Sequence, residues 1–139
     1  MYNFLKIEQN GAVTTLTISA PKSLNALNST ILGELGEAVK NLPCLILMNH
    51  SSFLDLEIVS RIFYPRPYCI VCTSDGFVGK SWLMRQLGCI PTQKFVSDVS
   101  LISDMDYALH SLKTSVLMYP EASYSFDGTA TPLPRKLLT

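Results

Sequence analysis

The order of apolar runs after Pro43 is the feature that most constrains the fold of this chain. Short, continuous apolar runs occur at residues 44–48, 68–72, around Ile90 and 115–119. Such runs are typical of strands that are buried on both faces of a parallel sheet. Because helix-length segments separate them, the sequence predicts an α/β fold with a mostly parallel sheet, flanking helices and right-handed crossovers.

Helical periodicity and stop signals place the intervening helices. The first helix is expected from about residue 52 to 63 and is ended by Pro65 and Pro67. The second is expected at about 78–87, before Gly88, which can terminate a helix in a left-handed conformation. The third begins after a capping Ser97 or Asp98 and continues to about Leu112.

The first 42 residues predict a separate unit ahead of this sheet. Two β-prone runs within residues 2–18 flank Asn10-Gly11, the dipeptide best suited to a type I′ hairpin turn. A helix is expected to follow from an Asn28 or Ser29 cap and to end before Pro43. We therefore divide the chain into an N-terminal hairpin and helix, 1–42, and an α/β part, 43–139.

Composition excludes several classes of protein. A chain of 139 residues with 47% hydrophobic and 16% charged residues is expected to form one core rather than to be disordered. The formal net charge of zero gives no electrostatic footprint for nucleic acid. The mean hydropathy of +0.24 indicates an apolar surface, such as a lipid groove. Trp82, Met84 and Leu87 are expected in the core or at a lipid-facing edge.

The location of the protein is predicted from missing sequence signals. No apolar run approaches the roughly 18 to 20 residues of a membrane-spanning helix. The N-terminus has no basic region followed by an apolar one, as a secretory signal would have. We expect a cytoplasmic protein, either free or peripheral at the inner face of the membrane.

The four cysteines are predicted to be reduced core thiols. All of them lie mostly among apolar neighbours: Cys44, Cys69, Cys72 and Cys89. Cys69 and Cys72 form a CxxC, but the two residues between them belong to a strand-like run without a turn. The sequence therefore predicts neither a metal site nor a redox pair there.

Chemistry-bearing residues follow three of the predicted strands. His50 and Asp55 follow the first strand, Lys94 the third and Glu121 the fourth. In a parallel sheet, residues at the carboxyl ends of strands meet at one edge. An aspartate that accepts a hydrogen bond from one ring nitrogen of His50 would leave the other nitrogen as a general base. Taken alone, the pair has an alternative interpretation, a turn histidine followed by a helix-capping aspartate.

Residues 43–134 resemble the glycerophospholipid acyltransferase family, which includes lysophosphatidic acid acyltransferases. The family's motif of histidine, four residues and aspartate, usually preceded by asparagine, matches Asn49, His50 and Asp55. Its second motif, a glycine followed by apolar residues and a basic residue, is similar to Gly88 through Lys94. Its third motif, which begins aromatic-proline-glutamate, resembles residues 119–125.

The resemblance implies a thioester donor, acyl-CoA or acyl-carrier protein, and a hydroxyl acceptor such as a lysophospholipid or glycerol phosphate. His50 would be the general base and Asp55 would orient it, with no metal and no cofactor. Lys94 would hold an acceptor phosphate and Glu121 would organise the acceptor site. The remaining substrate-binding residues implied by the motifs are Asn49, Gly88, Pro120 and Ser123.

The sequence departs from the family pattern at the third motif and at the C-terminus. Tyr124 stands where the family has a phosphate-binding arginine, and a phenol cannot replace a guanidinium fork. The chain stops at Thr139, before the family's fourth motif. An incomplete sheet is therefore expected, and its open edge would favour self-association. The alternative function is an inactive, truncated or fused remnant that binds acyl-CoA or lipid.

Residues 1–42 resemble the N-terminus of the crotonase, or enoyl-CoA hydratase, family. The resemblance rests on the hairpin and on residues 21–39, which contain the LNALN run and the following helix. It implies either a packing appendage or a retained CoA-binding segment, joined to the acyltransferase part near residues 41–43. A crotonase-type CoA enzyme is the third functional hypothesis.

Overall fold

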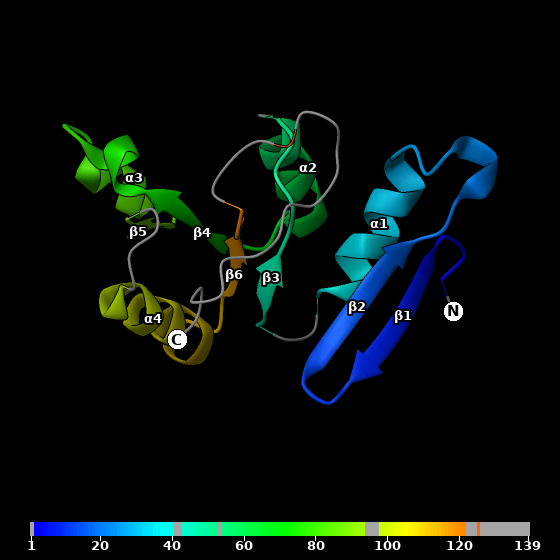
Figure 1. Cartoon of the computed structure of the whole chain (residues 1–139), viewed down its shortest axis with the longest axis horizontal. Coiled ribbons are helices and arrows are strands. Elements are labelled where there is room, and N and C mark those ends of the chain that lie inside the picture. The colour runs from blue at the N-terminus through cyan, green and yellow to red at the C-terminus, as the bar shows by residue number, and fades with distance from the viewer. Residues whose placement is uncertain (1, 41–42, 53, 94–97, 122–124, 126–139) are drawn as a thin grey trace.

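A four-stranded parallel sheet forms the centre of the α/β part. The computed structural model describes residues 2–40, 43–52, 54–93, 98–121 and 125. The strands are β3 (Leu45–Leu47), β4 (Tyr68–Thr73), β5 (Cys89–Thr92) and β6 (Ser115–Met118). Their order in the sheet is β3-β6-β4-β5, and every neighbouring pair is parallel (Figure 1). The α/β class predicted from the apolar runs is confirmed.

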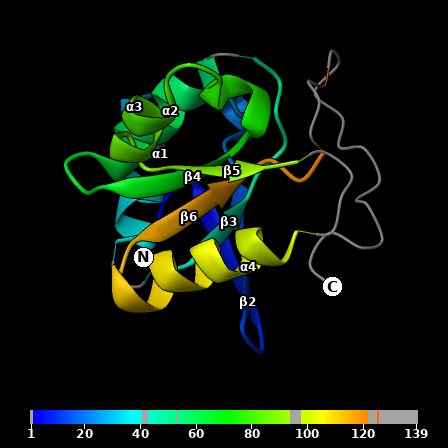
Figure 2. The same cartoon turned by 90° about the vertical axis from the view of Figure 1, so that its left-hand side faces the viewer.

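Helices cover both faces of this sheet. The helices are α2 (Leu54–Phe63), α3 (Ser81–Gln86) and α4 (Val99–Asp106), with short helical turns at η2 (Ser74–Phe77) and η3 (Tyr107–Ser111). Figure 2 shows α2 and α3 on one side of the sheet and α4 on the other. Each parallel strand is thus joined to the next by a crossover, as parallel pairing requires.

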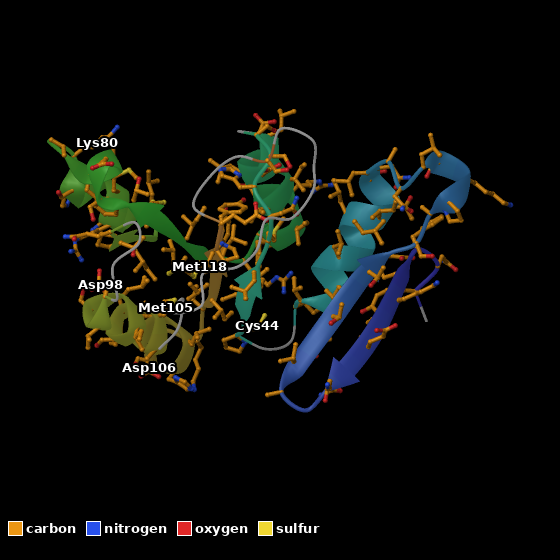
Figure 3. The ribbon with its side chains drawn as sticks, viewed as in Figure 1. Cys44, Lys80, Asp98, Met105, Asp106 and Met118 are labelled. Carbon is orange, nitrogen blue, oxygen red and sulfur yellow. The ribbon has the colours of Figure 1, made fainter. Side chains whose placement is uncertain are left out.

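The strand β6 is the most deeply buried element. All four of its residues are buried, and the side chains of Val116 and Leu117 have no exposed area. Val116 and Met118 pack with Met105 of α4, and Figure 3 shows Met118 and Met105 close together. Leu117 packs with Val59 and Phe63 of α2 on the other face. Successive side chains of β6 point to opposite faces of the sheet, so this one strand contributes to the hydrophobic cluster on each face.

The strand β3 differs from the prediction that it is buried on both faces. It pairs only with β6 among the described strands, and Leu47 keeps 45% of its side chain exposed. Its apolar run is as continuous as that of β6. Apolar character alone does not separate a central strand from an edge strand, because that depends on strand order.

The predicted helix at 78–87 is shorter in the structure, whereas continuous helical structure from residue 99 to 111 confirms the helix predicted to continue to about Leu112. Gly79 has a φ of +71° and delays the start of α3 to Ser81. Asp98 caps α4, as predicted, and accepts hydrogen bonds from the backbone N–H groups of Ser100 and Leu101. The regular helix ends at Asp106, and the π-helical turn η3 follows it. No helix in the described part of the chain is long and apolar enough to span a membrane.

The N-terminal hairpin is present, but its turn lies one residue later than predicted. The strands β1 (Leu5–Asn10) and β2 (Val13–Ile18) are antiparallel, with Asn10 opposite Val13. The central residues of the turn are therefore Gly11 and Ala12. Gly11 has a φ of +59°, and Ala12 does not have a positive φ. This pattern fits a type II′ turn rather than the predicted type I′ turn.

The helix α1 (Ser29–Ala38) begins as predicted, with Asn28 as its cap. The Asn28 side chain accepts a hydrogen bond from the N–H of Ile31 at 2.9 Å. The carboxylate of Glu34 accepts hydrogen bonds from the N–H groups of Asn3 and Phe4, at 2.8 and 2.9 Å. These bonds attach the start of the hairpin to α1.

The helix α1 also packs closely on α2. An ideal Cβ placed on Gly36 would lie 2.8 Å from the backbone oxygen of Ile62, so the approach needs a glycine. The Arg66 guanidinium donates to the Gly36 carbonyl at 2.8 Å. At Gly33, one turn earlier, a Cβ would meet nothing within 4 Å. Of the two glycines of α1, only Gly36 therefore lies at a close approach to α2.

Candidate active site

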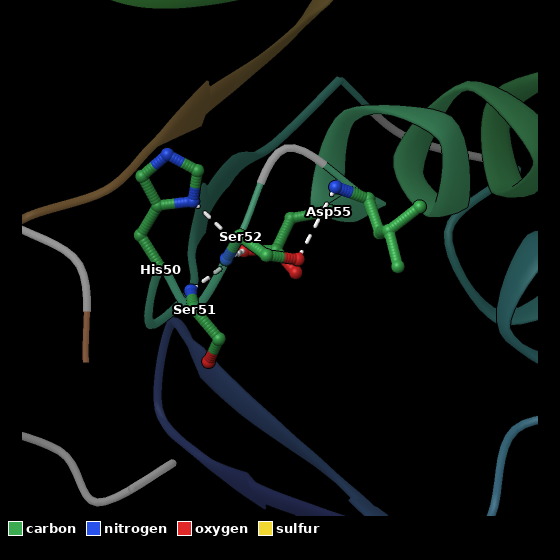
Figure 4. A network of polar contacts seen from close by, with 5 residues as sticks. His50, Ser51, Ser52 and Asp55 are labelled. Carbon is green, nitrogen blue, oxygen red and sulfur yellow. Dashed lines mark hydrogen bonds and ion pairs between the residues drawn. The ribbon is translucent and has the colours of Figure 1, made fainter. Parts of the chain in front are cut away.

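His50 and Asp55 form a hydrogen bond at the carboxyl edge of the sheet. The His50 Nδ1 lies 2.8 Å from the Asp55 Oδ2, well within hydrogen-bond range (Figure 4). His50 lies in the loop after β3, and Asp55 is in the first turn of α2. The side chains keep only 18% and 15% of their surface exposed. The predicted hydrogen bond is present; its catalytic role stays a prediction.

The loop before α2 folds around the Asp55 carboxylate. The same oxygen, Oδ2, accepts hydrogen bonds from the N–H groups of Ser51 at 2.7 Å and Ser52 at 3.0 Å. Burial by itself raises the pKa of Asp55, but these two bonds and the hydrogen bond and charge of His50 together outweigh it. The pKa of Asp55 therefore lies below its ordinary value, and the group is a carboxylate at neutral pH.

This carboxylate decides which ring nitrogen of His50 carries the proton in the neutral imidazole. An ionised carboxylate only accepts hydrogen bonds, so the Nδ1 must donate to it. The Nε2 then holds the lone pair of the ring. The pair can consequently take up a proton at the Nε2 and stabilise the resulting imidazolium through Asp55.

Tyr119 stacks on the face of the His50 ring. The two ring centroids are 4.1 Å apart and the planes are inclined by only 19°. Tyr119 comes directly after β6, the strand beside β3. Its hydroxyl is buried without a hydrogen-bond partner among the described residues. Burial raises the pKa of Tyr119 to about 12, and the nearby Asp55 adds to the effect, so the phenol stays protonated.

The residues after Tyr119 lie at the same edge of the sheet. Pro120 and Glu121 are both buried, with 8% of Glu121 exposed. Further along, the N–H of Ser125 donates to the His50 carbonyl at 2.6 Å. The segment that follows β6 is thereby joined to the loop that follows β3. The structure thus brings residues of the first and third motifs together.

Other predicted site residues lie elsewhere or outside the described residues. Asn49 is exposed at the end of β3. Gly88 lies before β5, at the amino edge of the sheet, which is the opposite edge from His50. Its φ is +78°, and a Cβ on it would lie 2.9 Å from the Tyr68 carbonyl, so local geometry explains the glycine. Lys94 and Ser123 lie outside the described residues, as does Tyr124.

A groove between α1 and α2 is separate from this cluster. It has a volume of about 410 Å³ and is lined by Lys40, Arg61 and Arg66, with Glu37 as its only acidic lining residue. Arg61 lies six residues beyond Asp55, about 9 Å along α2 at 1.5 Å per residue. The groove is a cationic surface near the end of α2, whereas Asp55 lies at the start of that helix.

The cysteines are all free thiols in the structure. Cys69 and Cys72 are three residues apart on β4, so their side chains point to opposite faces of the sheet. Burial, and next the neighbouring Cys89 thiol, raise the pKa of Cys72 to about 12. Among the described residues, no three His, Cys, Asp or Glu side chains gather at a point where they could hold a metal ion.

The stack of Tyr119 on His50 is the part of the site that the sequence did not reveal. The resemblance placed Tyr119 in the third motif but gave it no role. Its only sequence signal was a position directly after a predicted strand, as for His50. The contact needs β3 and β6 to be neighbours, and strand order could not be inferred from the apolar runs.

Comparison with known proteins gives one match. The model of the family described as Acyltransferase matches residues 31–137, from within α1 onward. No curated protein and no solved structure matches this chain significantly. The crotonase resemblance of residues 1–42 is not shown by these comparisons and stays a prediction. Because the match covers most of the chain and includes the His50 cluster, the protein belongs to the Acyltransferase family and has the general function of an acyltransferase.

Proposed function

We propose that this protein transfers an acyl chain from an acyl-CoA or acyl-carrier-protein thioester to a hydroxyl acceptor, with His50 as the general base. The 2.8 Å hydrogen bond between the His50 Nδ1 and the Asp55 Oδ2 carries this proposal. It fixes the proton on Nδ1 and presents Nε2 as the basic nitrogen at the carboxyl edge of the sheet.

In the proposed reaction the acceptor supplies the nucleophile. The His50 Nε2 takes the proton of the acceptor hydroxyl while its oxygen attacks the thioester carbonyl. The tetrahedral intermediate collapses, the C–S bond breaks, and the thiolate takes the proton back from the imidazolium. An ester and a free thiol are formed. The Asp55 carboxylate stabilises the imidazolium between these two proton transfers.

The acceptor is proposed to be a lysophospholipid or glycerol phosphate. Glu121 is buried and follows Tyr119 by two residues in the sequence. It is proposed to organise the hydroxyl-bearing end of the acceptor. Lys94 would attract an acceptor phosphate as a point charge. Because Tyr124 replaces the arginine of the family pattern, acceptors with and without a phosphate monoester both belong in the assay.

An exposed apolar surface around α3 supports a lipid acceptor. Val78, Trp82 and Leu87 keep 80%, 74% and 63% of their side chains exposed. Lys80 and Arg85 lie among them, and Lys80 is at the end of the molecule far from the hairpin (Figure 3). Val78 follows η2 at the carboxyl edge, where His50 also lies. We propose that this α3 surface contacts the membrane from which the acceptor is taken.

The test of the proposed function compares the two histidines of the chain. His110 also bonds an aspartate, Asp106, at 2.8 Å, but that pair is about 70% exposed on the surface. Transfer of a radiolabelled acyl chain from acyl-CoA to lysophosphatidic acid, lysophosphatidylcholine and glycerol phosphate is measured. We expect His50→Ala to lower turnover at least about 100-fold and His110→Ala to leave it unchanged. Undiminished turnover in His50→Ala would refute the general-base role.

A second candidate function is binding of acyl-CoA or lipid without turnover. The observation that favours it is Tyr124, at the position where the family pattern has its phosphate-binding arginine. In that case calorimetry detects acyl-CoA binding to the wild-type protein, while no acceptor in the assay gives a product. A labelled product that depends on His50 excludes this candidate.

A further inference from the structure

The aromatic ring of Tyr119 covers one face of the only histidine at the carboxyl edge of the described sheet. We infer that Tyr119 is a positioning residue for His50, which fixes the plane of the imidazole and stabilises its protonated form. The inference rests on the proposed general-base role of His50. It adds a residue, and a physical effect, that neither the predicted site nor the family match assigns.

The Tyr119 ring restricts the orientation of the His50 imidazole. The bond to Asp55 fixes the position of Nδ1 but still allows the ring to tilt about that contact. A stacked neighbour at 4.1 Å, inclined by 19°, blocks such a tilt on one side. Tyr119 is itself anchored, because it continues directly from β6, whose four residues are buried. The direction of the Nε2 lone pair is therefore set by a residue that follows the most deeply buried strand of the sheet.

The Tyr119 ring also interacts with the positive charge of a protonated His50. An aromatic face attracts a cation within about 6 Å of its centroid, and the imidazolium that forms during proton transfer would lie at stacking distance. Two described titratable groups contact His50, namely Asp55 from α2 and Tyr119 itself. Glu121 follows Tyr119 by two residues in the sequence. Asp55 acts in the plane of the ring and Tyr119 on its face. Removal of the aromatic ring should therefore make the protonated form of His50 less stable, even when Asp55 is intact.

The ring of Tyr119 and its hydroxyl can be tested separately. The Tyr119 hydroxyl is buried and has no hydrogen-bond partner among the described residues. A phenylalanine would keep the stack and remove a buried polar atom. Tyr119→Phe is thus a matched control for Tyr119→Leu, since both delete the hydroxyl and only the second deletes the ring.

Nuclear magnetic resonance tests the inference without relying on activity. The chain has two histidines, and the exposed His110 serves as an internal reference. In a titration of the imidazole signals, Tyr119→Leu should lower the pKa of His50 by roughly half a unit to one unit and leave that of His110 unchanged. Tyr119→Phe should reproduce the wild-type titration.

Steady-state kinetics then test whether the positioning of His50 by Tyr119 affects turnover. Tyr119→Leu should lower kcat roughly tenfold with little change in KM, and should move the acidic limb of the pH profile to lower pH. Tyr119→Phe should stay within about twofold of wild type. If the leucine variant does not melt cooperatively, Tyr119→Met, which fills the space without a ring, replaces it.

The outcomes separate this inference from the proposed function. A titration and a kcat that are the same in the leucine and phenylalanine variants would overturn the role of Tyr119. If His50→Ala keeps its turnover, the proposed function fails, but the titration of His50 still decides whether the Tyr119 ring stabilises the imidazolium.

Discussion

A single oxygen of Asp55 accepts three hydrogen bonds, so the conformation of the loop before α2 depends on this one residue. The Oδ2 receives the His50 ring and the N–H groups of Ser51 and Ser52. Both N–H groups precede α2 and would otherwise need other partners. The carboxylate therefore stabilises the start of the helix as well as the imidazole.

Asp55 should make a pH-dependent contribution to the free energy of unfolding. Its pKa in the folded protein lies below the ordinary value of 3.8. The stabilisation is thus complete above that ordinary value and is lost as the pH falls through the lower, folded-state value. In urea unfolding, Asp55→Asn should cost about 1.5 to 3 kcal/mol at pH 7, and the difference from wild type should shrink below pH 4.

Asp106→Asn is the matched control for this measurement. Asp106 bonds a histidine at the same distance as Asp55 does, but the pair is exposed on the surface. Its loss should change the free energy of unfolding by less than about 1 kcal/mol. A cost for Asp55→Asn that is constant from pH 3 to pH 7 would show that the charge of the carboxylate does not stabilise the fold.

Sequence reasoning found one half of this site and missed the other. His50 and Asp55 are five residues apart, so a short loop is enough to bring them together, and their bond was predicted. Tyr119 is far from His50 in the sequence, and the stack requires β3 to lie beside β6. Local patterns hold no information on such a pairing, because it is set by the packing of the whole sheet.

Among the helices and strands, the type of each segment was predicted more accurately than its exposure and its exact bounds. Every strand of the parallel sheet lies where an apolar run was found, and Asn28 and Asp98 cap helices as expected. The exposure of β3 and the late start of α3 were not predicted. Edge position depends on strand order, and the start of α3 depends on the left-handed conformation of Gly79.

The two glycines of α1 provide a matched pair of substitutions that tests the packing of α1 on α2. Gly36→Ala would bring a Cβ to 2.8 Å from the Ile62 oxygen, a backbone atom that cannot rotate away. We expect it to cost about 1 to 3 kcal/mol in the free energy of unfolding, because the helices must separate. Gly33→Ala meets nothing within 4 Å and should be neutral or stabilise the protein by about 0.5 to 1 kcal/mol.

Thermal and urea unfolding of the two variants give the measurement. Both substitutions add the same methyl group to the same helix, so any effect of helix propensity is shared. Equal changes in stability would contradict the close packing of α1 on α2. A loss confined to Gly36→Ala would show that the close approach of α1 to α2 stabilises the fold.

At the scale of the whole molecule, α1 connects the hairpin with the acyltransferase part. Glu34 binds the start of the hairpin, while Gly36, two residues later, contacts α2. The family match begins at residue 31, within the same helix. One short helix thus contacts both the hairpin and the helix α2 that covers the sheet.

Membrane contact by the α3 surface can be tested with lipid vesicles. In sedimentation with vesicles that contain anionic phosphatidylglycerol, Trp82→Ser should lower the bound fraction several-fold, and added salt should weaken wild-type binding through Lys80 and Arg85. Leu24→Ser is the matched control, since Leu24 is 93% exposed in the N-terminal unit. Trp82 is the only tryptophan, so a blue shift of wild-type fluorescence reports its insertion. An equal loss in both variants would contradict a specific surface.

Pro91 in β5 limits how the sheet can grow. The Gly88 carbonyl accepts from the Ile70 N–H at 3.0 Å, and Pro91 is opposite Cys72 in the parallel register. In that register the backbone groups of residues 88, 90 and 92 face β4, so the nitrogen of Pro91 points outward. A proline nitrogen carries no hydrogen. A strand from a second copy would therefore lack one hydrogen bond at Pro91, which disfavours lateral addition at β5. Among the described strands, β3 is at the other edge of the sheet, and no proline interrupts it.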